Sequence, residues 1–305
     1  MSGLEVTLGK LHLKNPIMPA SGTFAEQMTN YIDVNQLGAI IPKSITKHRR
    51  TGNPTPRICE TKAGGMINSI GIQSEGLTYF KEKTIPFYAS FSTPFIPSVS
   101  ADSIEEFTEV CEELGEMDEV DAIELNISCP NLKNNGVAFG MDPSVSYELV
   151  NRVRKVIKKP IIPKLSPNVT SIAEIARACE AAGADILTVS NTFIAMSIDV
   201  HTRKPKISNV MGGYSGPAIL PLVVRLVYQV HQATSLPIIG CGGVMTGEDA
   251  VELMLAGASA VQIGTASFVD PEAMITIREE IEDYMKLHGI KDIQEIIGGV
   301  MVHKP

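Results

Sequence analysis

Long apolar runs are missing from this sequence of 305 residues. No stretch approaches the ~20 apolar residues that a membrane-spanning helix requires, so we expect no membrane span. The first residues, Met1 to Glu5, do not contain a charged region followed by an apolar core, and we therefore expect no secretion signal.

Cysteine is scarce, and its spacing argues against clusters. The five cysteines form no CxxC pair, and they are Cys59, Cys111, Cys129, Cys179 and Cys241. Neither a zinc site nor an iron–sulfur cluster is predicted, and no other metal site is expected. Widely spaced thiols in odd number are typical of a reducing compartment, which predicts a cytoplasmic location.

Basic charge is also scarce. The net charge is −8, and the only basic cluster, Lys47 to Arg50, is interpreted as a solvated loop. Nucleic-acid binding is therefore not expected. No GxGxxG motif follows the first apolar run, so the sequence predicts no dinucleotide site of its own.

The composition, 44% hydrophobic and 20% charged, is that of a globular protein with a substantial core. No repeat, low-complexity tract or flexible linker divides the chain, so residues 1–305 are interpreted as a single domain. Leu4 to Leu13 alternate apolar residues around Gly9-Lys10, which predicts an N-terminal β-hairpin over the bottom of the fold.

Short apolar runs then alternate with amphipathic segments, which predicts a parallel sheet covered by helices. The predicted helices are Ile104–Leu114, Ile172–Ala182, Leu220–Ala233 and Asp249–Ala256. Eight runs is the number of strands in a (β/α)8 TIM barrel. The predicted strands are Pro16–Ala20, Ala39–Lys43, Phe95–Ser98, Ala122–Asn126, Ile161–Lys164, Ile186–Ser190, Pro237–Gly240 and Ala260–Ile263.

Two connections, residues 44–86 and 193–218, are too long for simple loops and are rich in glycine and proline. Long loops over the C-terminal face of a barrel are usually functional, although an insertion serving only subunit contacts is the alternative. Polar residues also end successive strands, which is the pattern of a barrel active site.

Glycines close the seventh and eighth predicted strands, at Gly242-Gly243 and at Gly264-Thr265. Glycine lets backbone N–H groups approach a phosphate closely, so this pair of strand ends predicts a phosphate site. Lys43 and Lys164 end two other strands, and a buried lysine usually faces an anion or a polarised ligand. Lys164 is interpreted either as contacting a flavin ring, whose reduced form is negatively charged, or as the Schiff-base lysine of an aldolase. The same choice applies to Lys43, and for each lysine the alternative is a side chain that only extends to solvent.

Cys129 follows the fourth predicted strand and is flanked by asparagines, unlike Cys111 and Cys179, which lie in helical patterns. A thiol titrating near about 8.5 can remove a proton from a weakly acidic carbon, so Cys129 is the candidate acid–base residue. The amides at the predicted mouth, which suit a ligand with alternating C=O and N–H groups such as a pyrimidine, are Asn68, Asn126, Asn131 and Asn191.

These motifs resemble those of class I dihydroorotate dehydrogenases. The resemblance follows the order of the chain from about residue 4 to residue 275. The matching segments are 20–24, 43–46, 52–57, 68–73, 126–131, 164–168, 191–192, 215–218, 242–243 and 264–265. Cysteine at position 129 resembles class I and not the membrane-associated class II. The segments 57–61 and 68–73 resemble the NAD-linked B type more than the fumarate-using A type.

The resemblance implies a TIM barrel that binds one FMN and oxidises dihydroorotate to orotate in UMP biosynthesis. The implied mechanism has Cys129 as base at C5 and a hydride passing from C6 to flavin N5. Implied flavin contacts are Ser21, Lys43, Ser44, Asn126, Lys164, Val189, Gly216, Gly242, Gly243, Gly264 and Thr265. Implied substrate contacts are Lys43, Asn68, Ser69, Ile70, Gly71, Ile72, Asn126, Asn131, Asn191 and Thr192.

The B type also implies a partner subunit carrying FAD and an iron–sulfur cluster, with two catalytic chains at the core of a heterotetramer. Three positions depart from the family pattern: Ser98 replaces an asparagine near the flavin, Ala195 replaces a glycine, and Ser74-Glu75 replaces Asn-Pro. The alternatives to this function are an A-type enzyme, a sister pyrimidine flavoprotein, a lysine aldolase without flavin, and a flavin-binding scaffold without catalysis.

Overall fold

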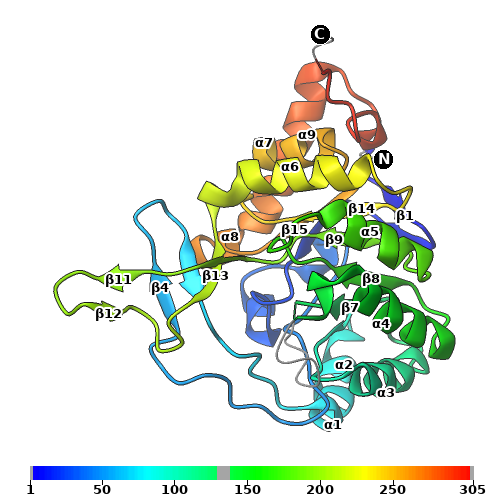
Figure 1. Ribbon diagram of the computed structural model, residues 1–305. Helices are drawn as coiled ribbons and strands as arrows, with labels where there is room; N and C mark the ends of the chain where they lie inside the picture. The colour runs from blue at the N-terminus through cyan, green and yellow to red at the C-terminus, as the bar shows by residue number, and fades with distance from the viewer. Residues whose placement is uncertain (1–2, 129–137, 303–305) are drawn as a thin grey trace.

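The computed structural model describes residues 3–128 and 138–302. At its centre lies a curved parallel sheet of seven strands in the order β3-β15-β14-β9-β8-β7-β6 (Figure 1). The strands are β3 (Ile17–Pro19), β6 (Ser98–Val99), β7 (Ile123–Asn126), β8 (Ile161–Lys164), β9 (Leu187–Val189), β14 (Ile238–Cys241) and β15 (Ala260–Ile263). Each lies within or beside a predicted run, because strands buried on both faces are largely apolar.

The second predicted strand, Ala39–Lys43, is the exception. Only an isolated bridge forms there, between Ile40 and Phe95. The N–H of Gly38 donates to Ile17 O of β3 at 2.7 Å, and that of Ile40 donates to Pro94 O at 2.8 Å. This segment therefore lies between β3 and β6 and closes the barrel. Pro42 has no N–H to donate, so a regular ladder ends there.

Helices alternate with these strands and form an outer layer of a (β/α)8 barrel (Figure 1). The larger ones are α3 (Ile104–Gly115), α4 (Pro143–Val156), α5 (Ile172–Ala181), α6 (Leu220–His231), α7 (Gly247–Leu255) and α9 (Ala273–His288). The shorter ones are α1 (Leu77–Tyr79), a π-helical stretch Phe80–Thr84, α2 (Ile85–Tyr88) and α8 (Ala266–Val269). Turns of 3-10 helix cover Glu26–Asn30, Val34–Gln36, Phe139–Met141, Pro217–Ile219 and Ile293–Glu295.

Hydroxyl caps explain where three of the predicted helices begin. Ser103 Oγ accepts from the N–H of Glu106 before α3, and Ser171 Oγ accepts from that of Glu174 before α5. Thr246 caps α7 in a reciprocal arrangement with Asp249. Each cap satisfies a backbone donor that the helix itself leaves without a partner. Among the described residues, we find no helix whose length and apolar character would let it span a membrane.

The predicted N-terminal hairpin is confirmed: β1 (Val6–Leu8) pairs antiparallel with β2 (Leu11–Leu13). Its apolar side chains are buried, and Leu8 is completely enclosed. A Cβ added at Gly9 in its turn would lie 3.8 Å from the carbonyl oxygen of Asp185, which precedes β9. The hairpin therefore packs at the N-terminal end of the barrel strands.

The two long connections join each other above the opposite end of the barrel. Residues 44–86 contribute β4 (Ile58–Glu60) and β5 (Met66–Asn68), and residues 193–218 contribute β10 (Phe193–Ala195) and β13 (Gly212–Ser215). These four strands form one antiparallel sheet, in the order β10-β13-β5-β4, which we call the roof sheet. A small hairpin of β11 (Ile198–Asp199) and β12 (Lys204–Pro205) projects beyond it (Figure 1).

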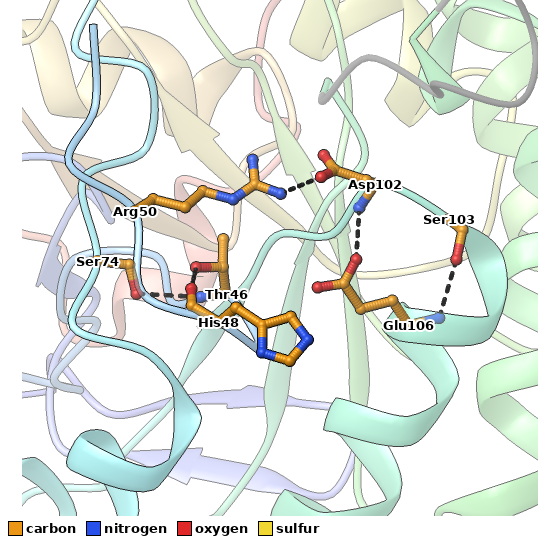
Figure 2. Close-up of polar contacts among 7 residues, drawn as sticks. All are labelled: Thr46, His48, Arg50, Ser74, Asp102, Ser103 and Glu106. Carbon is orange, nitrogen blue, oxygen red and sulfur yellow. Dashed lines mark hydrogen bonds and ion pairs between the residues drawn. The ribbon is translucent and has the colours of Figure 1, made fainter.

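Polar contacts tie the first long connection to helix α3 (Figure 2). The guanidinium of Arg50 forms an ion pair with Asp102, directly before the Ser103 cap. The backbones of Arg50 and Ser74 exchange two hydrogen bonds, of 2.8 and 3.0 Å, and Ser74 Oγ accepts from the N–H of Thr46 at 3.2 Å. These contacts fix both ends of the segment that leads into and out of β4 and β5.

Candidate active site

A cavity of about 420 Å³ opens at the C-terminal ends of the barrel strands, beneath the roof sheet. This volume lies in the range of small-molecule and cofactor sites. Strand ends and both long connections contribute to its wall. The lining residues include Ala20, Ser21, Lys43, Asn68, Asn126, Ser128, Lys164, Ser190, Asn191, Ser215, Cys241, Gln262, Gly264 and Phe268.

Most of the predicted site residues meet in this cavity. The lining contains Ser21, Lys43, Ser44, Asn68, Ile70, Gly71, Ile72, Asn126, Lys164, Asn191, Thr192, Gly216, Gly242, Gly243, Gly264 and Thr265. Val189 and Ser69 are not in its wall: Val189 is buried at the end of β9, and Ser69 Oγ instead accepts from Asn53 Nδ2 at 2.9 Å. Cys129 and Asn131 lie outside the described residues.

Lys164, the last residue of β8, carries a buried ammonium in the cavity wall; its exposed fraction is 5%. Its Nζ donates to Gln262 Oε1 at 2.7 Å, and Gln262 Nε2 donates to Glu124 Oε2 at 2.7 Å. Thr188 Oγ1 also contacts Glu124 Oε2, at 3.3 Å. These four inward side chains come from β7, β8, β9 and β15, so they form a polar layer where barrels usually pack apolar residues.

Charge balance in this layer decides the protonation of Lys164. Burial lowers the pKa of the ammonium, but the charges of Cys241 and Glu124 raise it by more, so the net direction is upward. Burial raises the pKa of the Cys241 thiol, although Lys164 opposes this. A thiol that keeps its proton carries no charge, so at neutral pH the neighbouring charge that favours the Lys164 ammonium is that of Glu124.

Glycines at the end of β14 bring backbone to the cavity wall. Gly242 and Gly243 have φ of 124° and 88°, a region that side-chain-bearing residues rarely adopt. A Cβ at Gly243 would lie 2.5 Å from Leu220 Cα, so only glycine fits. Beyond β15, Thr265 Oγ1 donates to Ser215 Oγ of the roof sheet at 2.8 Å. This arrangement is the one the sequence predicts for a phosphate site.

Amide side chains line the cavity from three directions. Asn191 Nδ2, after β9, donates to Asn126 Oδ1, at the end of β7, at 3.1 Å. Asn68 Nδ2, on β5, donates to the carbonyl of Gly213 on β13 at 3.3 Å. Thr192 O accepts from Asn168 Nδ2 at 3.0 Å. Hydrogen bonds within the chain thus hold the predicted amides Asn68, Asn126 and Asn191 in place.

The three positions that depart from the family pattern lie outside the cavity wall: Ser98, Ala195 and Ser74-Glu75. Ser98 is buried behind it and its hydroxyl lies 3.0 Å from Ser44 Oγ, so it acts on the cavity through Ser44. Ala195 belongs to β10 and pairs with Gly212. Glu75 forms an exposed ion pair with Arg49.

Several wall residues are missed by the sequence prediction. Gln262 lies inside the apolar run of β15, and only its inward position two residues before Gly264 could have indicated a role. Ser128 Oγ is buried with no hydrogen-bond partner among the described residues, which marks a polar position facing the cavity. Cys111 and Cys179, by contrast, are buried within helices, as predicted, and burial raises the pKa of Cys179 to about 12. Within residues 3–128 and 138–302, no three His, Cys, Asp or Glu side chains gather as a metal site.

Comparison with known proteins gives a consistent result. A family model described as dihydroorotate dehydrogenase matches residues 3–285. A protein of Alkaliphilus metalliredigens is 50% identical over 97% of this chain and 98% of its own length. Relatives in Geotalea uraniireducens and Bacteroides fragilis are each 48% identical, over 98% and 99% of this chain and 98% and 100% of their own. All three are named the catalytic subunit of dihydroorotate dehydrogenase B (NAD(+)). This chain belongs to the dihydroorotate dehydrogenase family.

Proposed function

We propose that this chain is the catalytic subunit of an NAD-linked dihydroorotate dehydrogenase and oxidises dihydroorotate to orotate in pyrimidine biosynthesis. The names of the relatives support this proposal. The observation that carries it is the position of Lys164: a buried cation lines the same cavity as the glycine-bearing ends of β14 and β15. A cofactor with a phosphate and a ring that becomes anionic requires both features.

The residues present fit FMN. Gly242 and Gly243 line the cavity with backbone and carry no side chain of their own, and the buried hydroxyl of Ser128 has no hydrogen-bond partner among the described residues. We assign the phosphate to the strand ends at 242–243 and 264–265, and the electron-rich edge of the flavin ring to Lys164. When bound, FMN supplies the acceptor for the hydride that leaves C6 of dihydroorotate.

The chain itself binds the pyrimidine and removes a proton. Asn126, Asn191 and Asn68 present both donors and acceptors to the cavity, which suits a ring of alternating C=O and N–H groups. We assign removal of the C5 proton to the sulfur of Cys129, in the segment that follows Ser128. The roof sheet lies over this cavity and contributes Met66, Asn68 and Ser215 to its wall.

The aldolase alternative is disfavoured by the charge of Lys164. A lysine that forms a Schiff base acts as a neutral amine, so its pKa must be low. Here Lys164 Nζ instead donates to Gln262 Oε1, and Gln262 links it to the Glu124 carboxylate, an arrangement that favours the charged ammonium. An ammonium that stays charged is suited to stabilise an anion, not to attack a carbonyl carbon.

We further propose that electrons reach NAD through a partner subunit with FAD and an iron–sulfur cluster, in a heterotetramer built on two copies of this chain. The names of the relatives as catalytic subunits support a partner. Four described cysteines are free thiols, which supports the cytoplasm as the location.

Anaerobic titration of the purified chain tests the dehydrogenase directly. The protein as purified should be yellow, and dihydroorotate should bleach the flavin absorbance. Dihydrouracil, which lacks the carboxylate of dihydroorotate, is the matched control and should bleach it far more slowly. A colourless protein that binds no added FMN would refute the proposal, and equal bleaching by dihydrouracil would assign the chain to another pyrimidine.

A further inference from the structure

The polar layer inside the barrel contains a carboxylate that the proposed reaction does not use. Glu124 is fully buried on β7, two residues before Asn126, and it faces the barrel interior. One of its oxygens accepts from Gln262 and Thr188, whereas Oε1 has no hydrogen-bond partner in the described chain. Burying a carboxylate with one oxygen unsatisfied is costly, so packing alone does not account for it.

Glu124 is linked to Lys164 through one amide, and the direction of the two hydrogen bonds is informative. Lys164 donates to the amide oxygen of Gln262, and the amide nitrogen of Gln262 donates to Glu124. A cation at one end and an anion at the other polarise the amide in the same sense, so each bond strengthens the other. The link also restricts the direction in which the Lys164 side chain points.

Two titratable side chains interact with Lys164: Glu124 from β7 and Cys241 from β14. The residues that β9 and β15 contribute to the layer, Thr188 and Gln262, do not titrate. Because Cys241 stays a neutral thiol at neutral pH, Glu124 is the anion that offsets the burial of the ammonium there.

We propose that Glu124 is a positioning residue: through Gln262 it holds the Lys164 side chain protonated and directed into the cavity. Its meaning for catalysis rests on the proposed function, in which the Lys164 charge faces the reduced flavin. The carboxylate itself does not touch flavin or substrate. It acts only through the lysine.

The test is the pKa of Lys164 in flavin-free protein, followed by NMR of ¹³C-labelled lysine methylene groups, with Lys164→Met to assign the signal. In Glu124→Gln the pKa should fall by about one unit or more, because an opposite charge nearby typically shifts a pKa by roughly 1–3 units. Glu112→Gln makes the same substitution on the exposed face of α3 and should change nothing. Thr188→Val removes a contact of Glu124 but no charge, and the pKa should stay within a few tenths of the wild-type value. An unchanged Lys164 pKa in folded Glu124→Gln would overturn the proposal.

If Glu124→Gln does not fold, Glu124→Met/Gln262→Met replaces the anion and its donor together, which buried polar pairs usually tolerate better. The Lys164 pKa must fall there too, and an unchanged value again overturns the proposal. In flavin-loaded protein, a plot of the flavin midpoint potential against pH should change slope at the alkaline pH where Lys164 loses its proton. In Glu124→Gln that pH should fall by the same number of units as the Lys164 pKa.

These two readouts separate this inference from the proposed function. If no flavin binds, the proposed function fails, whereas the lysine titration still reports on Glu124. If flavin binds and dihydroorotate reduces it, but Glu124→Gln leaves the titration unmoved, only the inference about Glu124 fails.

Discussion

The side-chain amide of Asn191 donates to the side-chain oxygen of Asn126 at 3.1 Å, which joins the ends of two strands separated by β8. If both amides hold the substrate, Asn191→Ala removes one contact and leaves Asn126 free to rotate. We expect the KM for dihydroorotate to rise by roughly fivefold, since a net hydrogen bond is worth about 1 kcal/mol. Steady-state kinetics and the orotate dissociation constant measure this. Asn209→Ala, on the exposed second connection, is the control, and equal KM values for the two variants would contradict the assignment.

The acid–base role of Cys129 predicts that Cys129→Ala keeps its flavin and loses turnover by ~10²–10⁴-fold. Cys129→Ser should keep some activity at high pH. A serine hydroxyl loses its proton less readily than a thiol, so it is the weaker base at neutral pH and improves as the pH rises. Cys59→Ala is the matched control, since Cys59 lies on β4 outside the cavity wall. Near-normal turnover of the alanine variant at neutral pH would remove Cys129 from the mechanism.

The charge of Lys164 predicts that Lys164→Ala weakens flavin retention or slows flavin reduction by dihydroorotate. Stopped-flow absorbance and the FMN dissociation constant are the measurements, with exposed Lys155→Ala as control. Borohydride treatment of the wild-type protein with carbonyl compounds addresses the aldolase alternative. A covalent adduct recovered at Lys164 would favour the aldolase over the flavin enzyme.

Gly264 offers a clean test of the phosphate site. A Cβ there would lie 3.5 Å from Ala20 Cβ, an ordinary contact, so Gly264→Ala should fold with an unchanged melting temperature in the absence of flavin. Its methyl group would intrude on the backbone surface assigned to the phosphate, and we expect FMN to bind about tenfold more weakly, a cost of about 1.4 kcal/mol. Unaltered FMN affinity in the folded variant would move the phosphate elsewhere. Gly243→Ala is uninformative, because its Cβ would meet the backbone of Leu220.

The isolated chain should reduce artificial dyes or oxygen with dihydroorotate, but not NAD. The sequence contains no dinucleotide fingerprint, and its cysteines are too dispersed for an iron–sulfur cluster. The measurement is NADH formation after mass spectrometry has excluded a co-purifying subunit. Rapid NADH formation by the chain alone would argue against the partner, and efficient turnover with fumarate would place the enzyme in the A type.

The barrel could be predicted from the sequence because its strands are short apolar runs that end in polar residues. Ile161–Lys164 shows this best, since the predicted and observed bounds are the same. The prediction of a regular strand at Ala39–Lys43 was wrong: only an isolated bridge forms there, because Pro42 interrupts the ladder of backbone hydrogen bonds. The roof sheet could not be predicted, since Asn68 pairs with Gly213 only after the barrel has brought the two connections together. Glu124 and Gln262 were missed for a related reason: each is a polar residue within an apolar run, and its partners lie on distant strands.

The roof sheet also has a thermodynamic consequence. Because β5 and β13 are hydrogen-bonded to each other, the chain itself orders the segments that carry Asn68 and Thr192. A ligand entering beneath them therefore loses little affinity to the ordering of loops, which otherwise costs about 0.5–1.5 kcal/mol for each immobilised side chain. Because the strands of the roof sheet come from both long connections and are hydrogen-bonded to one another, shortening either connection should disturb both.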